Sequence, residues 1–140
     1  MKIFRSELQV RGYELDAYGH VNNAVYLNYA EYARWCMIEE VTGGQDYFQK
    51  NACAPVVARV EIDYKKPCYL GDRLQIETKL LELRKRVGVF QHVILRGNQT
   101  VTEMRVTFVV VGTGGRAIAF PSDFGSLFGD MGGDKCGPKQ

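Results

Sequence analysis

Asp16 is the residue of this chain whose type and setting point most directly to catalysis. It lies in an irregular segment just before a stretch with helical periodicity, and Gly19, His20, Asn22 and Asn23 follow it. The N-terminus of a helix presents N–H groups without partners and a partial positive charge, so it can stabilise an oxyanion. A carboxylate held near that end can attack a carbonyl carbon or activate a water. These groups are the minimum needed to hydrolyse an activated ester.

A purely structural role accounts for the same residues. An Asp before a helix commonly caps it or forms a turn. His20, beside two Asn residues, can simply bond to the backbone of the loop. Spacing alone favours this structural interpretation and leaves catalysis as the alternative.

One long helix has to position these groups. Apolar residues and one arginine recur at helical spacing, at Ala24, Leu27, Ala30, Arg34, Ile38 and Val41. Asn22 or Asn23 can cap the start of this helix, and Gly43 can end it by adopting a left-handed conformation. The pattern predicts a helix of about 19 residues, roughly 28 Å long.

The remaining periodicity is that of β-strands. Alternation predicts strands over residues 3–13, 55–66, 73–83, 87–96 and 100–111. The resulting order is β–α–β–β–β–β, an α+β domain. One helix covers only part of one face of a sheet of such long strands, so we predict a homo-oligomer, at least a dimer.

The C-terminal part has a different composition. Residues 112–140 hold eight of the fifteen glycines. We therefore predict one domain over residues 1–121 and a flexible, glycine-rich tail over residues 122–140.

Composition excludes several classes of protein. The chain is 46% apolar and 24% charged with a net charge of +2, so it is neither a disordered chain nor basic enough throughout to bind nucleic acid. No apolar run approaches the length of about 18 residues that a membrane span requires. The N-terminal residues lack the apolar core of a signal peptide, so we expect a cytoplasmic protein. Four cysteines without a C-x-x-C pair and two histidines predict free thiols, and neither a metal nor a cofactor.

Residues 10–34 carry the most specific pattern, VRGYELDAYGHVNNAVYLNYAEYAR. This segment resembles the active-site segment of hotdog-fold acyl-CoA thioesterases of the 4-hydroxybenzoyl-CoA thioesterase-like group. It is most similar to the bacterial long-chain acyl-CoA thioesterase III type, and the resemblance extends over about residues 5–120. It implies the hotdog fold, in which a five-stranded antiparallel sheet wraps a long central helix. It also implies a fatty or aromatic acyl-CoA substrate, a place in fatty acid metabolism and a homo-oligomer, commonly a tetramer.

The resemblance also implies roles for individual residues. Asp16 matches the catalytic carboxylate, which acts as nucleophile or as general base. Asn23 falls where the backbone N–H at the helix start binds the thioester oxygen, and His20 belongs to the same catalytic group. Residues that hold the loop or line the substrate pocket are Gly19, Asn22 and Tyr26. Glu31 matches an acidic support position on the helix.

A basic turn is the second candidate site. Arg84, Lys85 and Arg86 stand between two predicted strands, in a part of the chain (residues 59–105) with ten basic and six acidic side chains. A charged turn of this kind is commonly just solvated, but basic side chains also bind phosphates well. In related enzymes the corresponding turn contacts the nucleotide, so the resemblance implies that these three residues bind coenzyme A. Lys65 and Lys66 are weaker candidates.

A sparse catalytic apparatus suits a thioester. A thiolate is a good leaving group, because thiols ionise near pH 8.5. The absence of a G-x-S-x-G motif argues against a serine hydrolase. The sequence therefore predicts an acyl-CoA thioesterase, with three alternatives: an acyl-carrier-protein thioesterase, a non-catalytic acyl-CoA-binding module, and a hotdog dehydratase using His20.

Overall fold

The computed structural model describes residues 2–44 and 46–129. Its helices and strands are, in chain order, β1 (Phe4–Gln9), a 3-10 turn (Gly12–Glu14), α1 (Val25–Thr42), α2 (Tyr47–Lys50), β2 (Ala54–Tyr64), β3 (Arg73–Leu83), β4 (Gly88–Arg96), β5 (Gln99–Val111), β6 (Ala117–Ile118) and α3 (Phe124–Leu127). The predicted order of one strand, a long helix and four strands is confirmed. The first strand is shorter than predicted, because residues 12–14 turn into the 3-10 conformation.

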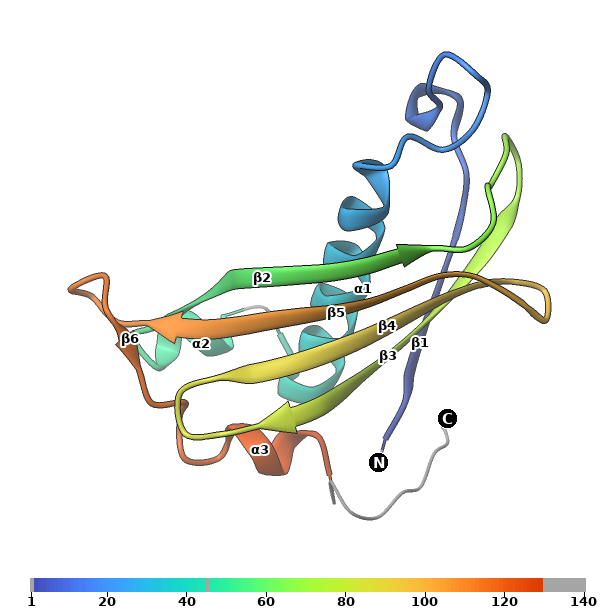
Figure 1. The fold of residues 1–140 in the computed structure, drawn as a ribbon. Helices are drawn as coiled ribbons and strands as arrows, with labels where there is room; N and C mark the ends of the chain where they lie inside the picture. The colour runs from blue at the N-terminus through green and yellow to red at the C-terminus, as the bar shows by residue number, and fades with distance from the viewer. Residues whose placement is uncertain (1, 45, 130–140) are drawn as a thin grey trace.

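The strands form one antiparallel sheet in the order β1-β3-β4-β5-β2 (Figure 1). A sixth strand that the alternation pattern did not predict, β6, pairs with the end of β5 at Val110 and Val111. The N–H of Gly112 donates to the carbonyl of Arg116 at 2.9 Å and so closes the glycine-rich turn that returns β6 to the sheet. Two residues are too short a strand to show alternation, which is why the pattern missed it.

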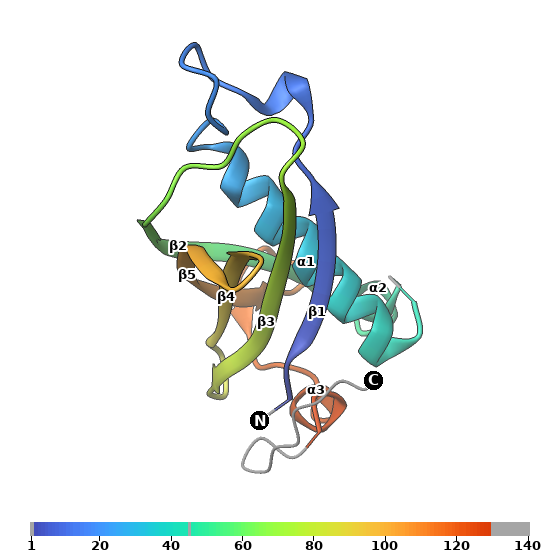
Figure 2. The same ribbon diagram turned by 90° about the vertical axis from the view of Figure 1, so that its right-hand side faces the viewer.

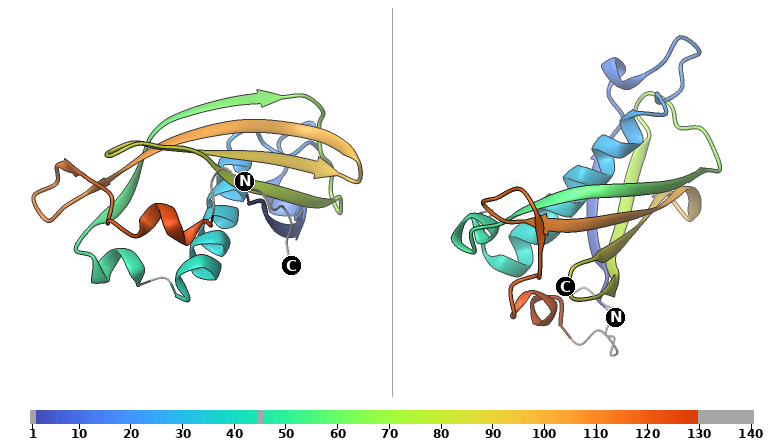
Figure 3. Two further views of the ribbon diagram at one scale, coloured as in Figure 1. Left: turned by 90° about the horizontal axis from the view of Figure 1, so that it is seen from below. Right: turned by 60° about the vertical axis from the view of Figure 1, so that its left-hand side comes forward.

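Helix α1 lies against one face of this sheet, and α2 and α3 lie on the same side (Figures 2 and 3). Its buried side chains recur at helical spacing, at Tyr26, Tyr29, Ala30, Ala33, Met37 and Ile38. The helix ends as predicted at Gly43, whose φ of 81° is the left-handed conformation that glycine adopts freely. It begins at Val25, one or two residues later than a cap at Asn23 or Asn22 predicts, because the side chain of Asn22 accepts the N–H of Ala24 at 3.0 Å and forms a turn first.

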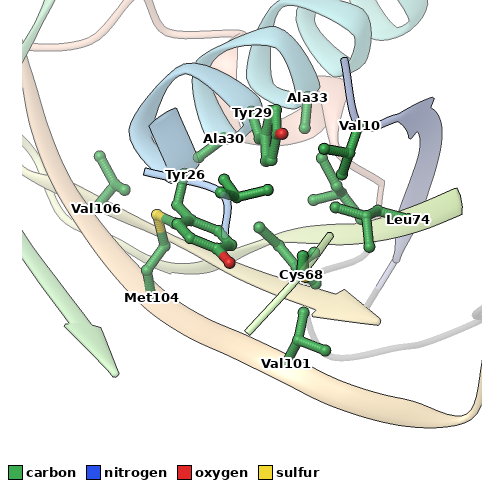
Figure 4. Packing of buried hydrophobic residues seen from close by; sticks show 13 residues of the cluster. Val10, Tyr26, Tyr29, Ala30, Ala33, Cys68, Leu74, Val101, Met104 and Val106 are labelled. Carbon is green, nitrogen blue, oxygen red and sulfur yellow. The ribbon is translucent and has the colours of Figure 1, made fainter. Parts of the chain in front are cut away.

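The core has two parts along α1. Around the first half of the helix, Tyr26 and Tyr29 pack with sheet residues that include Val101 and Met104 (Figure 4). Around the second half the core is rich in phenylalanine from α2, α3 and the sheet. The rings of Phe90 and Phe108 stack there with centroids 4.4 Å apart.

The predicted start of the tail at residue 122 is wrong. Residues 122–129 belong to the fold, since α3 buries Phe124 fully and Phe128 almost fully in the phenylalanine-rich core. The glycine-rich composition of this segment does not reveal that these two phenylalanines are buried. The rest of the predicted tail, residues 130–140, lies outside the described residues.

Strand β2 is an edge of the sheet and is largely exposed. Val56, Val57 and Tyr64 are among its exposed apolar residues. An exposed apolar edge strand offers unpaired backbone groups to another chain. Among the described helices, none is long and apolar enough to cross a membrane.

Candidate active site

Two loops meet at the N-terminal end of α1 and form the site. The loop between β1 and α1 lies beside the loop between β2 and β3, at the end of the molecule that is uppermost in Figures 1 and 2. The N–H of Val21 donates to the carbonyl of Cys68 at 2.9 Å, and His20 forms an isolated antiparallel bridge with Tyr69. The second loop therefore fixes the position of the segment that carries Asp16.

The Asp16 carboxylate is held by only one of its two oxygens. Oδ1 accepts the backbone N–H groups of Tyr18 at 2.9 Å and His20 at 3.1 Å. The backbone N–H of Asp16 itself donates to the carbonyl of His20 at 2.7 Å. Gly19 allows this tight loop, because its φ of 82° is strained for any residue with a Cβ. Within residues 2–44 and 46–129, Oδ2 has no hydrogen-bond partner, so this oxygen is available to attack a carbonyl carbon or to accept a proton.

These bonds keep Asp16 ionised. The backbone N–H of His20, and then that of Tyr18, stabilise the carboxylate and lower the pKa of Asp16 below its ordinary value of 3.8, although desolvation opposes the shift. A carboxylate at neutral pH can serve as nucleophile or as general base.

Asp16 opens onto a pocket of about 760 Å³, counting its wide mouth. Its wall is formed by Asp16, His20, Val21, Asn23, Tyr26, Tyr64, Lys65, Lys66 and Pro67. The backbone N–H of Asn23 has no acceptor in the described part of the chain. This N–H stands just before α1, where the partial positive charge of the helix adds to its attraction for an oxyanion.

The structure brings four of the predicted site residues together, namely Asp16, His20, Asn23 and Tyr26. Gly19 and Asn22 do not line the pocket but shape the loop around it, Gly19 through its backbone conformation and Asn22 through its bond to Ala24. The ring of His20 packs edge-on against Tyr69, with centroids 5.3 Å apart.

The basic turn is not part of this pocket in a single chain. Arg84, Lys85 and Arg86 are exposed and follow β3, while the pocket lies near the start of that strand. Eleven residues of extended strand span about 36 Å, so the two places are at opposite ends of the molecule (Figure 1). Lys65 and Lys66, the weaker candidates, are the basic residues that line the pocket.

The sequence analysis did not identify Glu14, which ties the loop that carries Asp16 to α1. Its buried carboxylate accepts the hydroxyl of Tyr29 at 2.8 Å, the backbone N–H of Arg11 at 2.9 Å and the guanidinium of Arg11. Burial disfavours its ionised form, but the bonds from Arg11 and Tyr29 outweigh this and lower the pKa of Glu14. The one signal in the sequence is the spacing of Arg11 and Glu14, three residues apart before a helix.

Comparison with known proteins identifies the family of this chain. The family model described as the thioesterase-like superfamily matches residues 10–128. The chain belongs to this superfamily. Among members with curated descriptions, the long-chain acyl-CoA thioesterase FadM of Escherichia coli strain K12 is 37% identical over 109 residues, covering 76% of this chain and 82% of that protein.

Two further comparisons bear on fold and on substrate. The crystal structure of YbaW from Escherichia coli superposes with a TM-score of 0.79 and 32% identity, covering 88% of this chain and 94% of that one. The chloroplastic acyl-acyl carrier protein thioesterase ATL3 of Arabidopsis thaliana is 27% identical over 124 residues, covering 87% of this chain and 65% of that protein. The predicted hotdog fold and its α+β class are thus confirmed.

Tyr64, like Glu14, is a residue near the site that the sequence analysis did not identify. Its hydroxyl, carried on β2, donates to the carbonyl of Asn23 at 2.9 Å. We expect Tyr64→Phe to lower kcat about fivefold, because it removes one hydrogen bond that orients the turn carrying the Asn23 N–H. Steady-state hydrolysis of an acyl-CoA measures this, with the exposed Tyr13→Phe as control. Equal kcat values for both variants would refute a positioning role.

A buried histidine on β4 contacts α1 away from the Asp16 pocket. His92 is fully buried, with Nδ1 3.0 Å from the hydroxyl of Thr78 and Nε2 3.1 Å from a guanidinium nitrogen of Arg34. Arg34 can only donate, so Nε2 accepts and Nδ1 carries the proton. Burial, together with the positive charge of Arg34, lowers the pKa of His92 to about 3.

This shift predicts a dependence of stability on pH. Between pH 6.5, the ordinary pKa of His92, and pH 3, the unfolded chain binds a proton that the folded chain does not. The free energy of unfolding therefore falls as the pH is lowered, with a contribution of up to about 1.4 kcal/mol per pH unit from this residue. Urea unfolding at several pH values between about 4.5 and 8 gives the free energy of unfolding as a function of pH. This free energy should change less steeply with pH for His92→Gln than for wild type. His20→Gln is the control, and identical slopes for wild type and His92→Gln would contradict the prediction.

Proposed function

We propose that this protein hydrolyses the thioester of an acyl-CoA to the free acid and coenzyme A. The observation that carries the proposal is the pairing of two unused groups in one pocket, the Oδ2 of Asp16 and the backbone N–H of Asn23. Membership of the thioesterase-like superfamily and the similarity to FadM support the same reaction.

The proposed reaction assigns one task to each group. The carbonyl oxygen of the thioester accepts the N–H of Asn23, which stabilises the negative charge that develops on it. Asp16 Oδ2 either attacks the carbonyl carbon or takes a proton from a water that attacks it. In the first case the carbon–sulfur bond breaks, an acyl-aspartyl anhydride forms and water then hydrolyses it. In both cases coenzyme A leaves as a thiolate and is protonated by solvent.

Basic side chains at the mouth of the pocket are proposed to bind the phosphates of coenzyme A. Lys65 and Lys66 take this role within one chain, since they line the pocket. Arg84, Lys85 and Arg86 serve the site only where another subunit brings its own turn to the pocket. His20 and Tyr26 form the wall around the thioester.

We also propose a homo-oligomer, dimer or tetramer, which the exposed β2 edge supports. Pairing of this edge with that of a second copy would satisfy its backbone groups and cover Val56 and Val57. Sedimentation should give the mass of two or four chains, and a monomer at micromolar concentration would refute the assembly.

A cytoplasmic location is also proposed, because Cys36, Cys53 and Cys68 are free thiols, as is usual in a reducing compartment.

The substrate test is release of free thiol from matched acyl donors. Hexanoyl-, dodecanoyl- and benzoyl-CoA should be compared with dodecanoyl-acyl carrier protein. Saturable release from one or more of the acyl-CoAs supports the proposal. Release from the carrier protein alone would make this protein an acyl-acyl carrier protein thioesterase, the class that the name of ATL3 describes. A folded protein that binds acyl-CoA but releases no thiol would be a binding module.

A further inference from the structure

The three most exposed large apolar side chains of the described residues gather at one end of the molecule. Tyr18, Tyr13 and Leu70 are 85%, 82% and 64% exposed. They lie on the tip, which consists of the loops between β1 and α1 and between β2 and β3 with the first residue of β3 (residues 10–24 and 65–73) and is uppermost in Figures 1 and 2. Single exposed apolar residues are ordinary on a protein surface, but a group of them marks an interaction site.

Leu70 stands at the apex of a tight turn, where polar residues are usual. The N–H of Asp72 donates to the carbonyl of Tyr69 at 3.0 Å, and the carboxylate of Asp72 accepts the N–H of Tyr69 at 2.8 Å. A Cβ added to Gly12 would lie 4.0 Å from Cδ1 of Leu70, so Leu70 lies beside the residue that precedes Tyr13. The apolar side chains of the two loops therefore share one surface on a hydrogen-bonded support.

The exposed charge of the tip is mainly positive. Its basic residues are all exposed, namely Arg11, Lys65, Lys66 and Arg73. Its acidic residues are buried or half-buried, namely Glu14, Asp16 and Asp72. Arg11 pairs with Glu14, and Asp72 pairs with Arg96, whereas the two lysines and Arg73 form no ion pair with another described residue. Three unpaired cations thus stand beside the exposed apolar side chains.

We propose that the tip docks on a membrane surface that contains anionic lipids, with Tyr13, Tyr18 and Leu70 at the level of the headgroups. Tyrosine favours that level because its ring is apolar while its hydroxyl stays hydrated. The unpaired basic side chains add attraction to the lipid phosphates. Both loops project beyond the helix and the sheet (Figure 1), so lipids can surround the tip.

One consequence of docking rests on the proposed function. The tip includes Asp16, Lys65 and Lys66, which line the pocket, so docking brings the mouth of the pocket to the membrane surface. Long acyl chains partition into that surface far better than short ones. Mutation of the tip should therefore slow hydrolysis of dodecanoyl-CoA presented with vesicles and leave that of hexanoyl-CoA unchanged. The docking itself does not depend on the proposed function.

Flotation with vesicles of phosphatidylcholine and phosphatidylglycerol in equal parts tests the docking. We expect wild type to bind these vesicles at least about tenfold more tightly than the double variant Tyr13→Ser, Leu70→Ser, and more tightly than vesicles of phosphatidylcholine alone. The matched control Tyr32→Ser, Val87→Ser removes an exposed tyrosine and an exposed aliphatic residue outside the tip, and it should bind like wild type. Asp16→Asn should bind at least as tightly as wild type, so loss of hydrolysis and loss of docking are separable.

A tryptophan in place of Leu70 reports insertion directly. On the mixed vesicles, the fluorescence of Leu70→Trp should shift to shorter wavelength and should be quenched by lipids that are brominated along the acyl chain. Val87→Trp, outside the tip, should show neither change. The wild type gives the background signal, because Trp35 is the sole tryptophan of the chain and packs against the phenylalanine-rich core.

Three results would overturn the proposal. The double variant could bind vesicles as tightly as wild type, or Leu70→Trp could escape quenching, and either result would show that the tip does not enter the membrane. Wild type could fail to bind vesicles and instead bind acyl carrier protein through Tyr13 and Leu70, which would make a protein the partner. The double variant could also change the oligomeric mass without losing vesicle binding, which would make a second copy the partner of the tip.

Discussion

Asp16→Asn is expected to lower kcat for acyl-CoA hydrolysis about a thousandfold or more. The side-chain amide cannot serve as a nucleophile or accept a proton at neutral pH, and such groups commonly contribute this much. The change should leave the loop intact, because the amide oxygen of Asn can still accept the N–H groups of Tyr18 and His20. Steady-state thiol release gives kcat, and urea unfolding checks that the fold is retained.

A matched control is available in Asp46→Asn. Asp46 is exposed, pairs with Lys50 at 3.3 Å and lies outside the pocket. This control should retain the wild-type kcat. If Asp16→Asn also retained it within threefold (about 0.6 kcal/mol), Asp16 would not be the catalyst, and His20 would be the next residue to test.

Glu14→Ala is expected to lower the free energy of unfolding by about 3 kcal/mol and to reduce kcat as well. Loss of the carboxylate leaves the buried hydroxyl of Tyr29 without its acceptor and removes the anchor of Arg11. The loop between β1 and α1 then loses its side-chain tie to the helix, so Asp16 and Asn23 are held less firmly. Urea unfolding and steady-state kinetics on the same samples measure both effects.

Tyr29→Phe separates the contributions within this cluster. It removes one hydrogen bond and keeps those that the backbone N–H and the guanidinium of Arg11 donate to Glu14, so the expected loss is only about 1 kcal/mol. A Glu14→Ala variant as stable and as active as Tyr29→Phe would show that the carboxylate is not the anchor of the loop.

The long elements of this fold were predictable because each satisfies one period over ten or more residues. Strand β3 was predicted at its observed bounds, and α1 ended at Gly43 as expected. Short elements were not predictable in this way. Helix α3 depends on two phenylalanines reaching a core that is built from distant parts of the chain, and a glycine-rich composition does not reveal such tertiary contacts.

The part of the candidate site whose residues are close together in the sequence was predictable. Asp16, His20 and Asn23 lie within eight residues of one another, so the loop before the helix brings them together. Tyr64 ends β2, and Lys65 and Lys66 follow it in the next loop; only the pairing of the two loops shows that they share the pocket. The basic turn at residues 84–86 is a case where the sequence suggests a ligand but not its place, since charge alone does not say which end of a strand faces the ligand.

Hydrolysis in ¹⁸O-labelled water shows both whether this protein hydrolyses an acyl-CoA and whether Asp16 is required. Wild-type protein with saturating dodecanoyl-CoA should release coenzyme A and dodecanoic acid in equal amounts over many turnovers, with solvent oxygen in the acid. Asp16→Asn, folded and still able to bind the substrate, should form almost none of the labelled acid. A folded wild type that binds dodecanoyl-CoA and leaves it intact would refute thioester hydrolysis, and a variant that forms labelled acid at the wild-type rate would refute catalysis by Asp16.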